Sequence, residues 1–247
     1  MTSSCKNVSI GEYDPRTGLT HITQQRGRLL FNMGPSVKKR QHHDLLVEAV
    51  DLTMSSGNYT GLSLYPEEAS YLSQQEALII YLMPRKGEDA PPLSAATFDV
   101  MVLNDAHVSL ACMQVYAFLK DHRLHPRRCR RPLMQSSFIC DSIPCIMANS
   151  ECRDVAFDVW KTMTCESAES AQRAKKRKML MRVFKVIVCR FGDALPSMRS
   201  LRNAANSTIS HNDLADNHVP LKVAVVHHDN TVLLFEVGTH DSNKTNK

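Results

Sequence analysis

The sequence of 247 residues lacks the long apolar run that a membrane-spanning helix requires. Such a helix needs roughly 20 apolar residues in a row, and Val186-Ile187-Val188-Cys189 is typical of the longest apolar runs here. The N-terminus also lacks the charged start and the apolar stretch of a secretory signal. We therefore expect a soluble intracellular protein with no membrane partner.

The sequence has eight cysteines, but none of them forms the C-x2-C pair that is typical of structural zinc sites. Without a secretory signal a reducing compartment is expected, which favours free thiols over disulfides. We assign no metal and no cofactor. A zinc module or zinc-dependent enzyme built on Cys129, Cys140, Cys145 and Cys152 remains an alternative.

Aromatic residues make up only 6% of the chain, which disfavours recognition of single-stranded RNA by stacking. Basic residues are abundant, and the net charge is +5. They gather in three clusters: Lys38, Lys39 and Arg40; Arg127, Arg128, Arg130 and Arg131; and Lys175, Lys176, Arg177 and Lys178. For any one cluster, a solvated face or a nuclear-import signal is a slightly better explanation than contact with nucleic acid. Three of them favour contact with the phosphates of a nucleic acid.

The pattern of apolar residues predicts an α+β protein with two domains. Residues 1–121 form a mixed helix and strand domain. Its predicted elements are a loose tail at 1–12, a turn at 14–18, strands at 19–23 and 28–33 that pair as a hairpin, a helix at 41–54, a strand at 59–65, a helix at 66–75, a strand at 77–83 and a helix at 94–121.

Residues 122–150 are basic and rich in proline, and we interpret them as an irregular linker. Residues 151–238 then predict a β-α-β-α-β-β domain, followed by a polar tail at 239–247. The predicted strands are 154–160, 181–191, 219–226 and 231–237, the helices are 164–178 and 195–203, and the last two strands form a hairpin around His227-His228-Asp229-Asn230.

Four stretches, in the expected order, resemble the larger non-catalytic structural subunit of the tRNA-splicing endonuclease. The most specific is similar to that subunit's L-x-P-E-E-A-x-Y-L pattern and runs Leu62-Ser63-Leu64-Tyr65-Pro66-Glu67-Glu68-Ala69-Ser70-Tyr71-Leu72. The others are 17–34, similar to its N-terminal hairpin; 157–160 with Phe191-Gly192-Asp193, similar to strands of the nuclease-type domain; and 219–237, similar to the closing hairpin.

The resemblance implies an endonuclease-like C-terminal domain and membership of a heterotetramer. In that complex this chain would scaffold the catalytic subunit and help to bind and position intron-containing pre-tRNA. A nuclear location follows, with the cytoplasm as the alternative. The chain is shorter than its relatives, because it lacks their long polar insert. Its closing turn has only Asp229, where relatives dock into a partner through several acids.

Catalytic members of this family use a tyrosine, a histidine and a lysine in the C-terminal domain. The six tyrosines of this chain end at Tyr116, so the nuclease-like half contains none. We interpret His227 and His228 as turn residues, because neighbouring side chains point in different directions and would not converge on one phosphate. No residue is assigned a catalytic role.

The closing strand, Val232-Leu233-Leu234-Phe235, is apolar on both faces. At a sheet edge it would pair with a strand of a partner, whereas in the sheet interior it would only fill the core. The candidate partner interface comprises His228, Asp229, Val232, Leu233, Leu234 and Phe235. A free-standing basic RNA-binding protein is the alternative to an endonuclease subunit.

Overall fold

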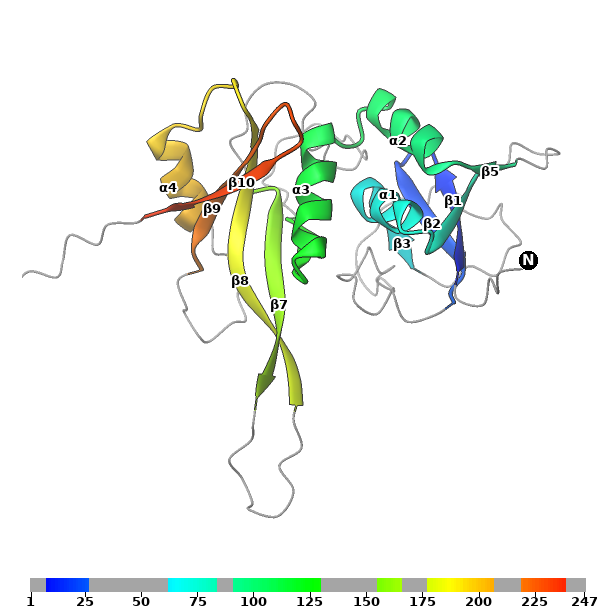
Figure 1. Cartoon of the computed structure of the whole chain (residues 1–247), viewed down its shortest axis with the longest axis horizontal. Coiled ribbons are helices and arrows are strands. Elements are labelled where there is room, and N and C mark those ends of the chain that lie inside the picture. Colours follow the sequence, from blue (N-terminus) through cyan, green and yellow to red (C-terminus); the bar gives the residue numbers. More distant parts are fainter. Residues whose placement is uncertain are drawn as a thin grey trace, which may run out of the picture. The chain divides into compact units, whose positions relative to one another are not determined.

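The computed structural model describes residues 8–26, 62–83, 91–129, 155–165, 177–206 and 219–238. The chain divides into two compact units between Ser109 and Leu110, and each unit combines helices with a mixed sheet (Figure 1). The predicted α+β class is therefore confirmed. Residues up to 121 were expected in the first domain, whereas Leu110–Asp121 lies in the second compact unit.

The first unit contains, within the described residues, a five-stranded sheet in the order β3-β2-β1-β4-β5. Strands β1 and β2 form an antiparallel hairpin, and β1 runs parallel to β4. The ring of Phe98 lies edge-on to that of the buried Tyr13, at 5.1 Å between centroids, so that α2 covers the sheet there. The elements are β1 (Ser9–Asp14), β2 (Leu19–Gln24), β3 (Ser63–Leu64), α1 (Pro66–Gln74), β4 (Leu78–Leu82), β5 (Pro92–Leu93) and α2 (Ala95–Asn104).

The N-terminal hairpin differs from the prediction. Residues 9–12 were expected in a loose tail but belong to β1, which pairs with β2, while β2 also pairs with β3. The predicted strand at 28–33 and the predicted helix at 41–54 lie outside the described residues. The tail was misjudged because β1 contains Gly11, where a Cβ would lie 2.9 Å from Cγ2 of Thr20. A glycine that allows two strands to approach closely weakens the apolar alternation of a strand.

Helix α1 begins where the sequence predicted. Pro66 occupies the first turn, where its missing N–H costs nothing. The side chain of Glu68 turns back and accepts a hydrogen bond from the backbone N–H of Tyr65 at 3.1 Å. Glu67 and Glu68 are both buried. The P-E-E-A motif is therefore a helix start, in which the buried carboxylate of Glu68 accepts from the N–H of Tyr65 at the cap.

The single helix predicted at 94–121 is wrong, because the chain forms α2 and α3 (Leu110–Asp121) instead. The backbone leaves α2 at Ala106, whose φ is +56°. The N–H groups of Ala106 and His107 then bond back to the carbonyls of Leu103 and Val102, as in a helix that closes its own C-terminus. No glycine or proline marks this end, so the continuous apolar pattern concealed it.

The second unit contains, among the described residues, a five-stranded sheet in the order β10-β9-β8-β7-β6. Only β8 and β9 run parallel; the other neighbours are antiparallel. The elements after α3 are β6 (His125–Arg128), β7 (Phe157–Cys165), β8 (Arg177–Arg190), α4 (Met198–Asn206), β9 (Leu221–Val226) and β10 (Val232–Val237). The predicted closing hairpin is confirmed by the pairing of β9 with β10.

Two predictions in this unit are wrong. The segment 122–150 is not wholly irregular, because β6 lies in it and pairs with β7. The predicted helix at 164–178 is strand at both ends, since Cys165 of β7 pairs with Arg177 of β8; residues 166–176 between them lie outside the described residues. At residues 164–165 and 177–178 the pairing of the β7–β8 ladder outweighed the charged helical pattern.

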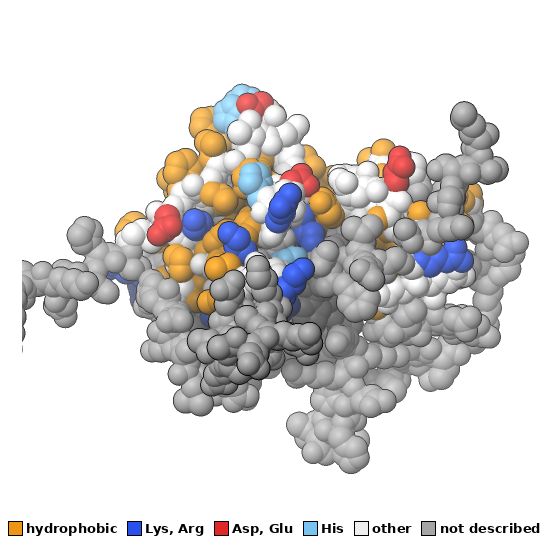
Figure 2. Space-filling view, turned by 60° about the horizontal axis from the view of Figure 1, so that its bottom comes forward, with side chains coloured by type: hydrophobic (Ala, Val, Ile, Leu, Met, Phe, Trp, Pro, Cys, Tyr) orange, Lys and Arg blue, Asp and Glu red, His pale blue; other side chains and the backbone are white. Residues whose placement is uncertain are grey.

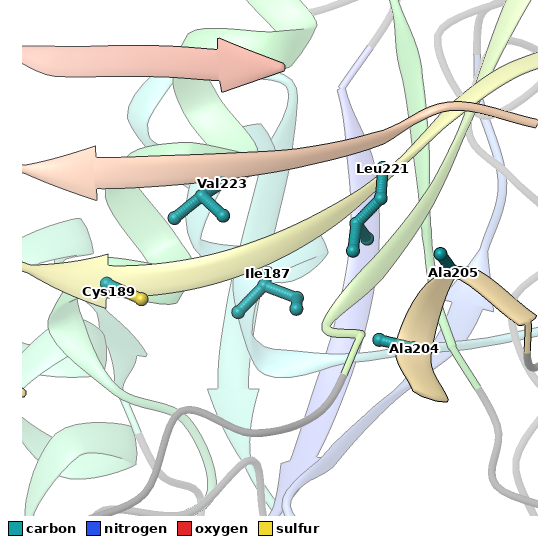
Figure 3. Close-up of a cluster of buried hydrophobic side chains, with 6 residues drawn as sticks. All are labelled: Ile187, Cys189, Ala204, Ala205, Leu221 and Val223. Carbon is teal, nitrogen blue, oxygen red and sulfur yellow. The ribbon is translucent and has the colours of Figure 1, made fainter. Parts of the chain in front are cut away.

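Helices α3 and α4 pack against the sheet of the second unit. Tyr116 of α3 lies against Phe157 of β7, with 6.0 Å between ring centroids. Ala204 and Ala205 of α4 meet a separate apolar cluster (Figure 3) formed by Ile187, Cys189, Leu221 and Val223. Because successive strand residues alternate between faces, these four side chains share the face opposite to Val186 and Val188.

Candidate functional site: the edges of the second sheet

The second sheet presents its two outer strands, β6 and β10, at opposite edges within the described residues. The candidate RNA contacts Arg127 and Arg128 lie on β6, and the candidate partner strand is β10. An outer strand has a row of backbone N–H and C=O groups that can pair with another chain. The two groups of residues are therefore separated by the width of the sheet.

Among the described residues β10 is an edge strand, whereas the sequence left an edge and an interior position equally open. The inner side of β10 pairs with β9 from Val232 to Val237. Val232 is buried, whereas Leu233 is 48% exposed and Phe235 is 54% exposed. These two residues are two positions apart and therefore lie on one face of the sheet. An exposed leucine and phenylalanine on a strand whose outer side pairs with no other described strand are suited to a protein partner.

The turn before β10 is held by its own side chains. Oδ1 of Asp229 accepts a hydrogen bond from the N–H of Thr231 at 2.9 Å and lies 3.0 Å from Nδ1 of His227. The bond from Thr231, and then His227, lower the pKa of Asp229 to about 2. The carboxylate of Asp229, the acid of this turn, is therefore ionised at neutral pH and stabilises the turn.

The expectation that His227 and His228 point apart is wrong. Their ring centroids lie 3.7 Å apart, and the ring of Phe191 lies 4.7 Å from the first and 6.0 Å from the second. The alternation of side chains holds along an extended strand, but the chain turns directly after β9. Nδ1 of His227 faces Asp229. The two histidines therefore pack within the turn, and their arrangement is not that of a catalytic acid and base.

The arginines of β6 are half-buried rather than fully solvated. The guanidinium of Arg127 lies 4.8 Å from the centre of the Trp160 ring on β7, a cation–π contact. Across the ladder Arg127 pairs with Asp158, which lies 3.5 Å from Arg182. These arginines thus contribute to the fold as well as to the charge of this edge.

Of the other predicted RNA contacts, two lie on β8 and the rest lie outside the described residues. Lys178 is exposed on β8, and Arg177 begins that strand. The remaining candidates, Lys38, Lys39, Arg40, Arg130, Arg131, Lys175 and Lys176, lie outside the described residues. On the face shown in Figure 2, basic and hydrophobic side chains are interspersed.

Of the four cysteines of the zinc alternative, only Cys129 lies in the described part of the chain. Burial, with Asp158 close by, raises the pKa of its thiol to about 11, which opposes the thiolate that a metal binds. Within the described ranges no group of three or more His, Cys, Asp or Glu residues is placed to hold a metal ion. No described helix is long and apolar enough to span a membrane.

Lys185 is a feature that the sequence analysis missed. It is buried in the middle of β8, and its Nζ donates to the carbonyls of Ala204 and Ala205 at 3.3 and 3.4 Å. Burial, and then Arg182, lower the pKa of this amine. A cation here meets the negative end of α4 and ties the helix to the sheet. The signal in the sequence was a lone lysine inside an apolar strand.

Residues 2–82 match the family described as tRNA-splicing endonuclease subunit Sen54, N-terminal domain. This part of the chain is therefore similar to the N-terminal domain of Sen54, and the match supports a Sen54-type subunit. The match spans β1 to β4 and α1, and so contains the resemblances at 17–34 and 62–72. The stretches at 157–160, 191–193 and 219–237 lie outside it. A search of curated proteins found no match.

The geometry explains the most specific part of the Sen54 match. Leu64 and Leu72 are buried, Pro66 opens α1, and Glu68 binds the backbone of Tyr65. The motif therefore determines how β3 joins α1. Its two glutamates are buried, so their carboxylates serve the fold.

Proposed function

We propose that this chain is the non-catalytic, architectural subunit of a tRNA-splicing endonuclease, which scaffolds the catalytic subunit and helps to bind intron-containing pre-tRNA. The observation that carries the proposal is a Sen54-type N-terminal domain in one chain with a second unit whose edge strand exposes Leu233 and Phe235. The proposal places the chain in a heterotetramer and in the nucleus, with the cytoplasm as the alternative.

The proposal assigns the partner interface to β10 and the turn before it. Leu233 and Phe235 provide apolar contact, Val232 and Leu234 hold the strand on β9, and His228 and Asp229 border its start. Co-purification with catalytic subunits that carry the tyrosine tests this assembly. A monomer that binds pre-tRNA without such subunits would favour the free-standing RNA-binding protein instead.

The purified chain alone is expected not to cleave intron-containing pre-tRNA. Cleavage by the family's chemistry requires a base for the 2′-hydroxyl, an acid for the leaving oxygen and a cation near the phosphate. No tyrosine follows Tyr116, and His227 is engaged by Asp229. The measurement is single-turnover cleavage with excess protein and without catalytic subunits. Robust cutting at the splice sites would refute the non-catalytic assignment.

The pair Arg127→Gln and Arg128→Gln is expected to lower the salt dependence of pre-tRNA binding. Each lost phosphate contact reduces the slope of log K against log salt by about 0.7 to 0.9, so the expected change is about 1.5. Glutamine is preferred to glutamate, because a carboxylate at Arg127 would face Asp158 across the ladder. The measurement is the dissociation constant over a series of salt concentrations.

The matched control removes the same charge from α4, by Arg199→Gln and Arg202→Gln, both at exposed positions. It should leave the slope near that of the wild type if β6 makes the contact. Equal loss in both variants would indicate a general effect of net charge. A wild-type slope in the β6 variant would remove these arginines from the RNA interface.

A further inference from the structure

Strands β7 and β8 continue past the sheet as a two-stranded ribbon (Figure 1). The neighbouring strand β6 pairs with β7 only up to Trp160, and β9 pairs with β8 only from Lys185 onward. Beyond these points β7 and β8 pair with each other out to Cys165 and Arg177. Within the described residues, this part of the ladder therefore has no strand on either side.

One face of the ribbon carries three methionines. Met163 lies directly opposite Met179, and Lys161 lies directly opposite Met181. Residues that face each other across a ladder, or that are two positions apart, share a face. Met163, Met179 and Met181 are therefore contiguous, and we call them the methionine face. Their side chains are 42%, 46% and 43% exposed.

The opposite face of the ribbon has a different character. It carries Thr162, Thr164, Lys178 and Leu180. Thr162 bonds through its hydroxyl to Nε2 of His125 on β6, at 3.0 Å. This face is thus mostly polar and partly tied to the edge of the sheet. The apolar character is concentrated on the methionine face, where it is exposed to solvent.

The charges around the methionine face limit what can cover it. In a face-to-face pair of copies Lys161 would be brought towards its own counterpart, which disfavours a second copy of this chain. RNA is disfavoured as well, because the thioethers offer no ring for bases and, among the described side chains of this face, Lys161 is the single positive charge. Methionines do adapt to apolar side chains of varied shape. Lys161, which lies on the methionine face opposite Met181, would pair with a carboxylate at the border of such a segment.

We propose that the methionine face docks an apolar polypeptide segment flanked by acidic residues, in another protein of the endonuclease complex. This inference rests on the proposed function, since it takes the partner from that complex. The methionine face would be a second protein-binding surface, and it shares no residue with β10. An uncovered two-stranded ribbon is marginally stable in water, and a docked segment would order it.

The test is amide hydrogen exchange of the ribbon in the reconstituted endonuclease complex, compared with the free chain. The ribbon amides of β7 should exchange about tenfold more slowly in the complex. A triple variant, Met163→Thr with Met179→Thr and Met181→Thr, should lose this protection, while threonine preserves the strands. Met198→Thr, at an exposed methionine of α4, is the matched control and should retain it.

The charge requirement has its own pair of variants. Lys161→Glu should reduce the protection, whereas Arg199→Glu on α4 should not. Protection that persists in the triple variant, or that appears only after pre-tRNA is added, would overturn the inference. So would protection that depends only on the concentration of the chain itself, which indicates a second copy. An assembled complex with an unprotected ribbon would overturn this inference and leave the proposed function intact; failure of the wild-type chain to join any complex would overturn both.

Discussion

A chain carrying Leu233→Thr and Phe235→Thr is expected to bind its catalytic partner about a hundredfold more weakly than the wild type. Both side chains lie on the exposed face of β10, at 48% and 54% exposure, and so contribute little to the fold of the free chain. Burial of each at an interface is worth about 1.5 kcal/mol or more, and the two together account for about two orders of magnitude. The measurement is the dissociation constant of the purified partners.

The control for this prediction is a second pair of exposed apolar residues away from β10, Val100→Thr and Leu110→Thr. This variant should bind the partner as the wild type does. Circular dichroism should show that both variants keep their folds, because Val232 and the pairing with β9 are unchanged. Wild-type affinity of the β10 variant would show that the partner docks elsewhere.

Replacement of Gly18 by alanine is expected to destabilise the N-terminal domain by about 3 kcal/mol. Gly18 has a φ of +67°, a conformation that costs an L-residue about 1 kcal/mol. Its added Cβ would also lie 2.5 Å from Cγ of His107. The imidazole cannot move freely, because its Nε2 is bonded to the carbonyl of Pro15 at 2.7 Å. Relief of the overlap therefore requires a backbone shift, for about 1–3 kcal/mol more.

Native-state hydrogen exchange of the β1–β2 amides measures this effect without assuming that both units unfold together. Gly192→Ala is the matched control, since it has a φ of +91° but no atom within 4 Å of the added Cβ. It should cost its own unit only about 1 kcal/mol. Adding His107→Ala to Gly18→Ala should recover the steric part. Equal costs at Gly18 and Gly192 would contradict the predicted clash.

Elements with strong local signals were predicted well from the sequence. The start of α1 follows from Pro66 and Glu68, whose effects act within one helical turn. The closing hairpin follows from two apolar runs on either side of a polar turn, and the Sen54 resemblance at 62–72 lies in the matched region. In each case the relevant interactions join residues that are close in the sequence.

The two candidate surfaces needed more than local signals. The residues of β10 were named from the sequence, but the sequence was evenly balanced between an edge and an interior strand. The ribbon was hidden altogether, because its ends fell within a predicted helix at 164–178. The side chains of His227 and His228 were expected to point apart, as neighbours on a strand do. The chain turns at this point, and the two rings lie together.

The sequence by itself determined that this is an α+β protein with a Sen54-type N-terminal domain, a tyrosine-free C-terminal half and three basic clusters. Only the tertiary structure decided that β10 and β6 are sheet edges, that the helical pattern at 94–121 divides into two helices, and that three methionines meet on one face. The physical reason is that composition and turns are local properties. Strand order and register depend instead on hydrogen bonds between distant segments, which no local pattern specifies.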